Sequence, residues 1–426
     1  MTFAIHTFGC KVNIYESEYI TNLLQENNYT LIDFNHPKEA NIYIINTCTV
    51  TNEADKKDRK LIHTTRTNHP NSILIVMGCY AQLNPNDIDA DIVIGNKYKS
   101  QIIELINEFK KTNKKIVKVE DISKTNFEDM YINRFVTHTR AFVKIQDGCN
   151  AFCAYCAIPY SRGGIRSKDF NKVISEVTNL VNNGYKEIVL TGIHTGRYGL
   201  EKHSNLESLL KELVKVKDLF RIRLSSIEIN EITDGIIDLI KNNDIMAKHL
   251  HIPLQSGSDA ILKSMNRLYD TKYFIDRINY IRKEIPDISI TTDLILGFPG
   301  ETDKEYKETL DTLSKINFTK IHTFPYSRRT GTKAASMPNQ IDGITKKCRV
   351  KEVINISNNN EIKFYKSKID NIYDGIIETR KDGKKIAITT NYIPVELNTD
   401  LENNAKVTFK IIKVTNSLVL GEILKN

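Results

Sequence analysis

The chain has 426 residues, enough for two or three domains, and its 40% hydrophobic and 26% charged residues are typical of a folded globular protein. No apolar run approaches the ~18 residues of a membrane-spanning helix, and the first ten residues lack the features of a secretion signal. We therefore expect a cytoplasmic protein without membrane contact. In a reducing compartment, seven cysteines favour metal ligands or catalytic groups over disulfides, and a net charge of +8 suits a polyanionic partner.

The first 115 residues alternate between strand and helix patterns. Short apolar runs bounded by turn residues predict buried strands at residues 3–8, 42–46, 73–77 and 92–94. Helix patterns lie between them at residues 16–27 and 52–65. This alternation predicts an open parallel α/β sheet, and we assign residues 1–115 to a first domain.

Residues 110–136 are rich in Lys, Asn and Asp, which predicts a connection with one short strand at residues 116–119. A second alternating series follows and defines a second predicted domain, residues 137–366. Its predicted strands are residues 141–146, 187–191, 221–225, 249–253, 288–296 and 320–326. Its predicted helices are residues 171–182, 206–216, 233–242, 271–283, 302–316 and 344–366. Six βα units are too few for a closed eight-stranded barrel, so we expect a partial (βα)6 barrel.

The last segment, residues 367–426, changes character. Five short β-rich runs separated by turn signals predict a small antiparallel β-barrel, a type of domain that often binds RNA.

Three cysteines, Cys149, Cys153 and Cys156, lie close together directly after the first strand of the partial barrel. Reactive groups in such folds follow the carboxyl ends of strands. A zinc site normally needs four ligands, and a fourth Cys or His is missing nearby. Three thiolates can instead hold three corners of a four-iron cluster and leave the fourth iron open to a small molecule.

Three further cysteines follow three predicted strands of the first domain: Cys10, Cys48 and Cys79. Because the carboxyl ends of parallel strands meet at one edge of a sheet, these thiols are expected to converge. They therefore predict a second three-cysteine cluster. Cys348 lies in a basic helical run, and we expect no ligand role for it.

The motif of residues 149–163, CNAFCAYCAIPYSRG, resembles the signature of the radical S-adenosylmethionine (SAM) superfamily. With the second cysteine set, the whole chain resembles the methylthiotransferase family. Further matching motifs are TFGCKVNIYES (7–17), NTCTVT (46–51), MGC (77–79), LTGIHTG (190–196), LSSIE (224–228), HIPLQSG (251–257) and TDLILGFPGE (292–301). The C-terminal barrel resembles the family's RNA-binding TRAM domain.

The resemblance implies two 4Fe-4S clusters and SAM as cofactors, with all six cysteines as iron ligands. One SAM would supply a methyl group to a sulfur at the Cys10/Cys48/Cys79 cluster. A second would be cleaved at the other cluster, giving a radical that takes hydrogen from carbon 2 of an adenine. The implied partners are the anticodon loop of tRNA and an electron donor such as flavodoxin or ferredoxin.

Within the family, GCKVN (9–13) and NTCTVT (46–51) look most like the branch acting on N6-threonylcarbamoyladenosine at position 37 of tRNA. The isopentenyladenosine branch tends to GCQMN at the first of these sites. Residues 391–392, Asn-Tyr, also match, whereas AITT at residues 387–390 replaces the Gly-His-Thr that usually precedes them, a departure that bears on the detail of RNA contact by this domain and not on the chemistry.

Residues near the predicted strand ends are candidates for SAM contacts. They are Tyr155, Gly192, Glu228, Gln255 and Gly297. Their alternative roles are loop packing and turn formation.

Two sets of basic residues are candidate anion contacts. Arg162 and Arg166 follow the cysteine triplet, where they can meet phosphate or carboxylate or lie exposed. Between residues 320 and 351, eight Lys or Arg accompany one acid, so this stretch is either a phosphate-contacting surface or a solvated face.

The leading hypothesis is thus a tRNA methylthiotransferase that modifies carbon 2 of threonylcarbamoyladenosine. The alternatives are the isopentenyladenosine or ribosomal-protein branch of the same family, or a non-catalytic zinc- and RNA-binding protein.

Overall fold

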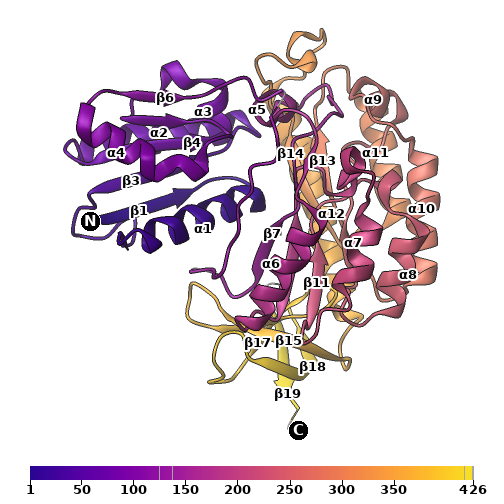
Figure 1. Cartoon of the computed structure of the whole chain (residues 1–426). Coiled ribbons are helices and arrows are strands. Elements are labelled where there is room, and N and C mark those ends of the chain that lie inside the picture. The colour runs from indigo at the N-terminus through magenta and orange to yellow at the C-terminus, as the bar shows by residue number, and fades with distance from the viewer. Residues whose placement is uncertain (124, 137, 417, 425–426) are drawn as a thin grey trace.

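The computed structural model describes residues 1–426 except residues 124, 137, 417 and 425–426. A parallel sheet formed by the N-terminal part lies beside a second set of parallel strands, and a β-barrel lies at the C-terminus (Figure 1). In the part of the chain that is described, no helix is both long and apolar enough to cross a lipid bilayer.

The N-terminal sheet has strand order β2-β1-β3-β4-β5-β6, with every neighbouring pair parallel. Its strands are β1 (Thr2–Thr7), β2 (Thr30–Leu31), β3 (Ile42–Thr47), β4 (Ile73–Gly78), β5 (Ile92–Ile94) and β6 (Ile116–Lys118). Its helices are α1 (Lys11–Glu26), α2 (Asn52–Asn68), α3 (Cys79–Leu83) and α4 (Ile102–Thr112), with the 3-10 turns η1 (Pro85–Asp87) and η2 (Lys99–Gln101).

Alternate residues of β3 face opposite sides of this sheet. Ile42 and Ile44 pack into a core with side chains of α1 and α4, whereas Tyr43 and Ile45 pack with side chains of α2 and α3. Burial of both faces is what continuous apolar strands require. The predicted open parallel sheet is confirmed.

The central strands form two parallel sheets with orders β7-β10-β11 and β12-β13-β14. Single bridges, Ile222 to Met246 and Ser226 to His251, join them into one open arc. The strands are β7 (Ala141–Lys144), β10 (Glu187–Thr191), β11 (Arg221–Leu224), β12 (His249–His251), β13 (Ser289–Leu296) and β14 (Lys320–Pro325). The arc confirms the predicted partial barrel.

Helices cover the side of the arc that faces away from the N-terminal sheet (Figure 1). They are α6 (Phe170–Asn182), α7 (Leu206–Leu213), α8 (Asp234–Asn242), α9 (Asp259–Ser264), α10 (Thr271–Glu284) and α11 (Asp303–Ile316). The long helix α12 (Gly343–Lys366) packs against β14. Shorter elements are β8 (Gln146–Asp147), α5 (Ile158–Arg162), β9 (Arg166–Ser167), and the 3-10 turns η3 (Thr195–Arg197), η4 (Leu200–Lys202), η5 (Ile229–Glu231) and η6 (Lys333–Ser336).

The C-terminal strands close into a barrel of order β15-β16-β17-β19-β18. They are β15 (Ile372–Thr379), β16 (Lys385–Ile388), β17 (Pro394–Leu397), β18 (Lys406–Val414) and β19 (Val419–Ile423). The predicted small barrel is confirmed, with one difference: β17 and β19 pair in parallel, because β19 closes the barrel between β17 and β18.

Two arginines of β11 attach the C-terminal barrel to the central strands. Arg221 donates to the carbonyl oxygens of Asp374 and Ile388, both at 2.8 Å, and Arg223 donates to those of Thr389 and Thr390, both at 3.2 Å. The AITT segment therefore lies against the central strands. Its backbone makes contacts inside the protein, and the expectation on RNA contact by this domain stays a prediction.

Candidate active site

The cysteines of the N-terminal sheet lie at one edge, as predicted from the strand ends. Cys10 follows β1, Cys48 follows β3, and Cys79 follows β4 as the first residue of α3. The Asn13 side chain donates to the carbonyl oxygens of Phe8 at 2.8 Å and Thr47 at 2.9 Å, which ties the ends of β1 and β3 together.

Two glycines permit the close approach of these strand ends. Gly9 has φ +99°, and a Cβ there would lie 2.9 Å from the Cβ of Cys48. Gly78 has φ +104°, and a Cβ there would lie 2.6 Å from the carbonyl oxygen of Thr47. Larger residues are excluded at both positions by backbone conformation and by space.

The thiols of this set influence one another. Burial raises the pKa of Cys48 to about 12, and the nearby thiols of Cys79 and Cys10 contribute to the increase. The Sγ of Cys79 accepts hydrogen bonds from Arg162 Nε at 3.2 Å and Asn96 Nδ2 at 3.5 Å. These two side chains fix the position of the thiol at the end of β4.

The cysteine triplet lies in the loop between β8 and α5. Its backbone is fixed by hydrogen bonds from Cys149 N to Gly163 O at 2.9 Å and from Ala154 N to Met265 O at 2.9 Å. Burial raises the pKa of Cys156 to about 12, and the thiols of Cys153 and Cys149 add to this. The three thiols of the loop are therefore close neighbours.

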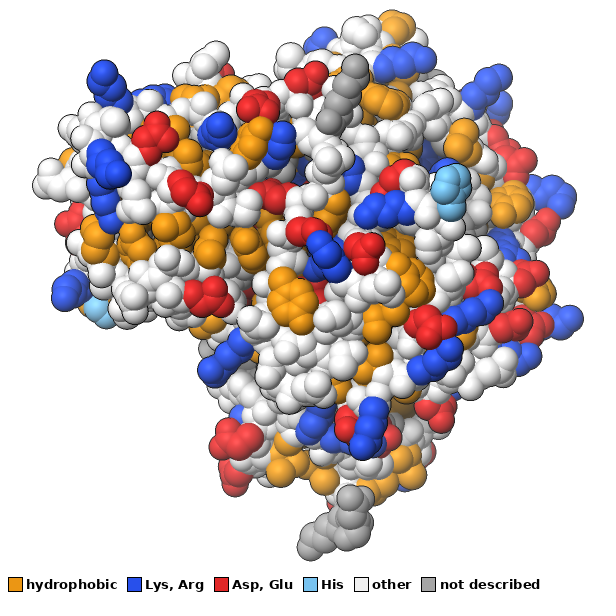
Figure 2. Space-filling model, viewed as in Figure 1, with side chains coloured by type: hydrophobic (Ala, Val, Ile, Leu, Met, Phe, Trp, Pro, Cys, Tyr) orange, Lys and Arg blue, Asp and Glu red, His pale blue; other side chains and the backbone are white. Residues whose placement is uncertain are grey.

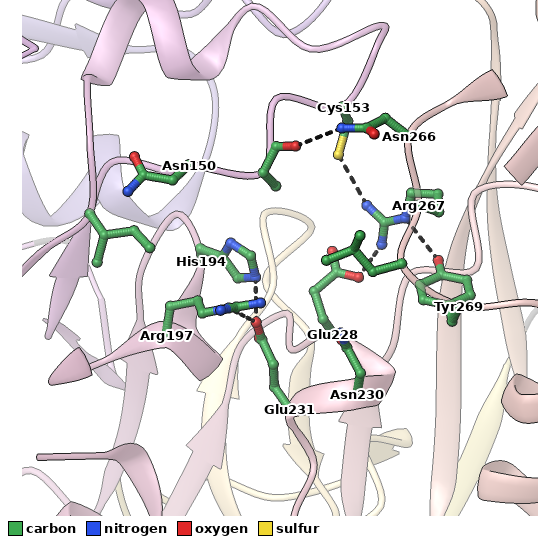
Figure 3. Close-up of a pocket in the computed structure, with 13 residues that line it drawn as sticks. Asn150, Cys153, His194, Arg197, Glu228, Asn230, Glu231, Asn266, Arg267 and Tyr269 are labelled. Carbon is green, nitrogen blue, oxygen red and sulfur yellow. Dashed lines mark hydrogen bonds and ion pairs between the residues drawn. The ribbon is translucent and has the colours of Figure 1, made fainter. Parts of the chain in front are cut away.

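A cavity of about 330 Å³ adjoins the triplet (Figure 3). On one side Arg267 donates to Cys153 Sγ at 3.4 Å and forms an ion pair with Glu228. On the other side His194 lies between Cys149 Sγ, at 3.3 Å from its Nδ1, and Glu231, at 2.8 Å from its Nε2.

His194 is a cation in this setting. Burial lowers its pKa, but the contacts with Cys149 and Glu231 outweigh burial and raise the pKa to about 10. Cationic groups of His194 and Arg267 thus face two of the three thiols, an arrangement that suits thiolates holding a cluster.

The predicted SAM-contact residues fall into different places. Glu228 lines the 330 Å³ cavity, and Tyr155 and Gln255 line a second cavity, of about 190 Å³, with Cys156. Gly192 lines a third cavity, of about 560 Å³, with Cys10. Gly297 instead packs against Lys346, whose Cγ lies 2.1 Å from where a Cβ would stand, and this close packing fits a turn.

The loops that carry two of the cysteines, Cys48 and Cys156, meet at a shared cavity. The 190 Å³ cavity is lined by Val50 and Thr51, from the loop that follows Cys48, and by Tyr155 and Cys156 of the triplet loop. The loop that follows Cys48 and the triplet loop are therefore neighbours.

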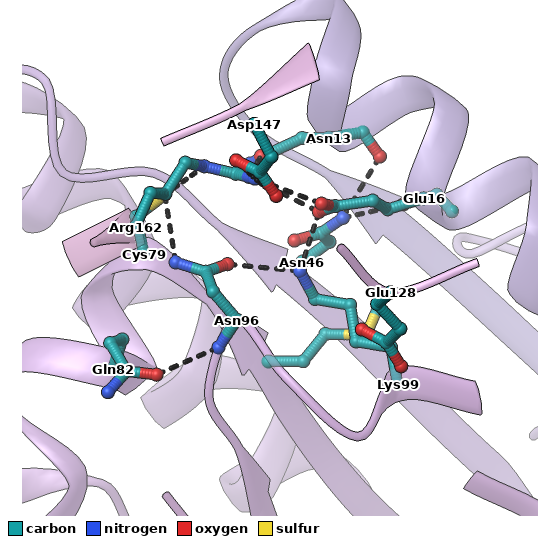
Figure 4. Close-up of polar contacts among 12 residues, drawn as sticks. Asn13, Glu16, Asn46, Cys79, Gln82, Asn96, Lys99, Glu128, Asp147 and Arg162 are labelled. Carbon is teal, nitrogen blue, oxygen red and sulfur yellow. Dashed lines mark hydrogen bonds and ion pairs between the residues drawn. The ribbon is translucent and has the colours of Figure 1, made fainter. Parts of the chain in front are cut away.

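A buried ionic cluster also joins the two sets (Figure 4). Glu16 of α1 forms ion pairs with Lys99 at 2.6 Å, Lys144 at 2.8 Å and Arg162 at 2.9 Å. Asp147, next to the triplet, pairs with Lys144 at 2.7 Å and Arg162 at 3.1 Å. The side chains of Glu16, Lys99 and Arg162 are fully buried.

The donor sets fit iron–sulfur clusters. Among the residues placed by the structure, no three Cys, His, Asp or Glu side chains are grouped to hold a single metal ion. A four-iron cube needs a wider arrangement, with one thiolate for each of three irons. Each set supplies three neighbouring thiols, and cavities adjoin Cys153 and Cys156 of the triplet and Cys10 of the N-terminal set.

Among the basic residues considered as anion contacts, Arg162 and Arg166 meet a carboxylate, one of the expected partners, whereas two residues of the 320–351 stretch require correction. Arg329 is buried and pairs with Asp55 at 2.7 Å, and Arg349 is buried and pairs with Glu301 at 2.8 Å, so neither can serve a phosphate-contacting surface. Arg162 meets carboxylates in the interior. On the face seen in Figure 2, Lys and Arg are interspersed with Asp and Glu.

Several residues of the site were not identified from sequence. They are Glu16, Lys99, Asp147, His194, Glu231 and Arg267. His194 lies inside the LTGIHTG motif, and this motif could have identified it as a site residue. The ionic cluster joins residues more than 80 positions apart, such as Glu16 and Lys99. No local sequence pattern predicts such a contact.

Comparison with known proteins agrees with this geometry. A profile described as the radical SAM superfamily matches residues 143–313, and one described as uncharacterized protein family UPF0004 matches residues 2–97. The chain is 43% identical to the threonylcarbamoyladenosine tRNA methylthiotransferase MtaB of Bacillus subtilis (strain 168), over 92% of this chain and 90% of that protein. The chain belongs to the radical SAM methylthiotransferase family. Family membership implies SAM and a 4Fe-4S cluster as cofactors.

Two further proteins similar to this methylthiotransferase have lower sequence identity. The tRNA-2-methylthio-N(6)-dimethylallyladenosine synthase of Clostridium tetani (strain Massachusetts / E88) is 33% identical over 92% of this chain and 88% of that protein. One similar solved structure is TsrM from Kitasatospora setae, a radical SAM methyltransferase with cobalamin and a 4Fe-4S cluster bound. The match covers 78% of this chain and 77% of the TsrM chain. Its TM-score is 0.57 at 13% identity, which shows a shared fold.

Proposed function

We propose that this enzyme transfers a methylthio group to carbon 2 of N6-threonylcarbamoyladenosine at position 37 of tRNA. Two observations favour this base over the isopentenyl derivative. Identity to the B. subtilis enzyme is 43%, against 33% to the dimethylallyladenosine synthase. The GCKVN motif at residues 9–13 also matches the threonylcarbamoyladenosine branch.

We further propose that the chain holds two 4Fe-4S clusters, one on Cys149, Cys153 and Cys156 and the other on Cys10, Cys48 and Cys79. The first, with SAM, supplies radical chemistry, and the second supplies the sulfur that is transferred. Tyr155, Glu228 and Gln255 are the best placed of the predicted residues to bind SAM, because they line cavities that contain cysteines of the triplet.

The observation that carries the proposal is the link between the two cysteine sets: Arg162, which ends the helix after the triplet loop, donates to Cys79 Sγ at 3.2 Å. Val50, Ile295 and Phe324 give the 190 Å³ cavity beside Cys156 an apolar lining, which suits radical chemistry. A nucleotide must leave its stack to enter such a site, as an unpaired anticodon-loop base can do.

The remaining assignments are also proposals. The tRNA would be bound in part by the C-terminal barrel, electrons would come from a donor such as flavodoxin or ferredoxin, and the enzyme would act in the cytoplasm. The domains would be residues 1–115, 137–366 and 367–426, each containing one of the hydrophobic cores or sheets described above.

The function is tested with purified protein reconstituted with iron and sulfide under anaerobic conditions. Incubation with SAM, dithionite and tRNA that carries threonylcarbamoyladenosine is expected to give its 2-methylthio derivative on nucleoside mass spectrometry. If product forms only with tRNA that carries isopentenyladenosine, the enzyme belongs to the isopentenyladenosine branch of the family. A colourless protein that binds zinc and gives no product would support the non-catalytic alternative.

A further inference from the structure

The 560 Å³ cavity lies where the Cys10 loop, the central strands and the C-terminal barrel meet. Gly9, Cys10 and Lys11 line it from the N-terminal sheet, Gly192 and Arg223 from the central strands, and Tyr392 from the C-terminal barrel. Its volume lies in the range of small-ligand sites. It also opens directly beside Cys10, a proposed ligand of the sulfur-bearing cluster.

Lys11 differs from the other Lys and Arg side chains that line this cavity. Arg223 pairs with Glu187 at 2.9 Å, and Lys320 pairs with Glu361 at 2.8 Å. Within the described chain, Lys11 forms no ion pair with a carboxylate. Lys11 is therefore a basic side chain of this cavity that the described residues leave without a carboxylate at ion-pair distance.

The surrounding groups strengthen this positive field. Burial acts to raise the pKa of Tyr392, yet Arg140, Lys11 and Arg223 together outweigh burial and hold the pKa below its ordinary value. Glu187, a buried acid whose charge acts on Lys11, is already shared by Arg140, Arg221 and Arg223. An anionic ligand in this cavity would thus meet basic side chains of the N-terminal part and of the central strands.

We propose that Lys11 binds the threonyl carboxylate of the substrate nucleoside and thereby makes the enzyme prefer threonylcarbamoyladenosine to a base with an uncharged N6 substituent. This inference rests on the proposed function. Lys11 is a substrate-binding residue that determines specificity.

The covalent structure of the modified base is consistent with a contact between Lys11 and the threonyl carboxylate. Carbon 2 and the carbon that bears N6 belong to the same six-membered ring of adenine. When carbon 2 faces the cluster on Cys10, the N6 substituent lies a few atoms away. Lys11 follows Cys10 in sequence and carries its ammonium on a flexible four-carbon stem, so it can meet a carboxylate at the end of that substituent.

Binding measurements test the inference. The probes are an anticodon stem-loop RNA with threonylcarbamoyladenosine at position 37 and the same RNA with the threonyl carboxylate capped as a methyl ester. Affinities of the iron-reconstituted protein are measured by fluorescence anisotropy for the wild type, Lys11→Gln and Lys11→Arg. Each protein is described by the ratio of its affinities for the two RNAs, because a general loss of RNA contact lowers both affinities equally. Iron content and thermal melting show that each variant is folded.

The wild type is expected to bind the acid about ten- to a hundredfold more tightly than the ester, the range of one charge-assisted hydrogen bond. Lys11→Gln should bring this ratio close to one, and Lys11→Arg should retain most of it. An unchanged ratio in Lys11→Gln, or no discrimination by the wild type, overturns the inference. Turnover of the acid RNA by the wild type is measured in parallel, so that a failure of the proposed function is seen separately.

Discussion

Arg162 donates a hydrogen bond from Nε to the Sγ of Cys79 over 3.2 Å, and this contact joins the two cysteine sets. Arg162 ends α5, the helix that directly follows the triplet loop, whereas Cys79 begins α3 of the N-terminal sheet. The same guanidinium pairs with Glu16 at 2.9 Å and Asp147 at 3.1 Å. One side chain therefore fixes the relative position of both sets.

Replacing Arg162 with Met should destabilise the protein and weaken iron binding at the N-terminal set. The substitution leaves Glu16 and Asp147 with fewer buried counter-charges, so the free energy of unfolding should fall by about 3–5 kcal/mol. Cys79 loses a donor at the same time, and iron content should fall from about eight toward about four per chain. Urea unfolding and iron analysis check the two effects.

Arg66→Met is the matched control. Arg66 also pairs with an aspartate, Asp91 at 2.7 Å, but both side chains are about one-fifth exposed. Its loss should cost less than about 1 kcal/mol and leave the iron content unchanged. Equal effects of the two substitutions would show that the buried ionic cluster has no special role.

Single cysteine substitutions should separate the work of the two sets. Cys153→Ala is expected to abolish cleavage of SAM, whereas Cys48→Ala should retain cleavage and lose methylthiolation. Each should lose about half of the iron. Cys348→Ala, which changes an exposed thiol on α12, should alter neither activity. Methylthiolation that survives in Cys48→Ala would refute the division of labour.

Gly9→Ala should destabilise the N-terminal site more than an ordinary glycine substitution. The position has a left-handed φ of +99°, and the added Cβ would lie 2.9 Å from the Cβ of Cys48. Strain and crowding together should cost about 2–4 kcal/mol. Gly184→Ala has a similar φ of +94° with nothing within 4 Å, and should cost only about 1–2 kcal/mol. Equal losses in the two variants would mean that Cys48 can move aside.

His249 should make the protein less stable in mild acid. Burial, with a contribution from Arg223, holds its pKa well below the ordinary value near 6.5. Below pH ~6.5 the unfolded chain therefore binds a proton that the folded protein does not, and the free energy of unfolding falls by up to about 1.4 kcal/mol per pH unit. Above that pH this contribution is constant.

The effect is measured by urea unfolding at pH 7.5 and 5.5. His249→Gln should reduce the loss of stability between the two values, whereas the exposed His36→Gln should not. If both variants lose as much stability as the wild type, protonation of His249 is not responsible.

Much of the fold could be predicted because local patterns and tertiary structure agree. The period of the apolar residues places α12 within one residue of its start, and the Thr302 and Glu305 capping box predicts the start of α11. Convergence of Cys10, Cys48 and Cys79 follows from strand order alone, since the carboxyl ends of parallel strands share one edge.

Contacts between distant residues could not be predicted in the same way. The basic run around Arg329 and Arg349 resembles a surface, yet Asp55 and Glu301 bury these two side chains. The burial of Arg162 depends likewise on Glu16, which lies 146 residues away. A charge in sequence gives no sign of whether its partner is water, RNA or a carboxylate in the interior.

The central claim is tested most directly by mass spectrometry of tRNA nucleosides from a strain that lacks this gene, with and without a plasmid copy. We expect the deletion to remove 2-methylthio-threonylcarbamoyladenosine, to accumulate threonylcarbamoyladenosine, and to be restored by the wild-type copy but not by Cys48→Ala. An unchanged amount of the methylthio nucleoside in the deletion strain would contradict the account.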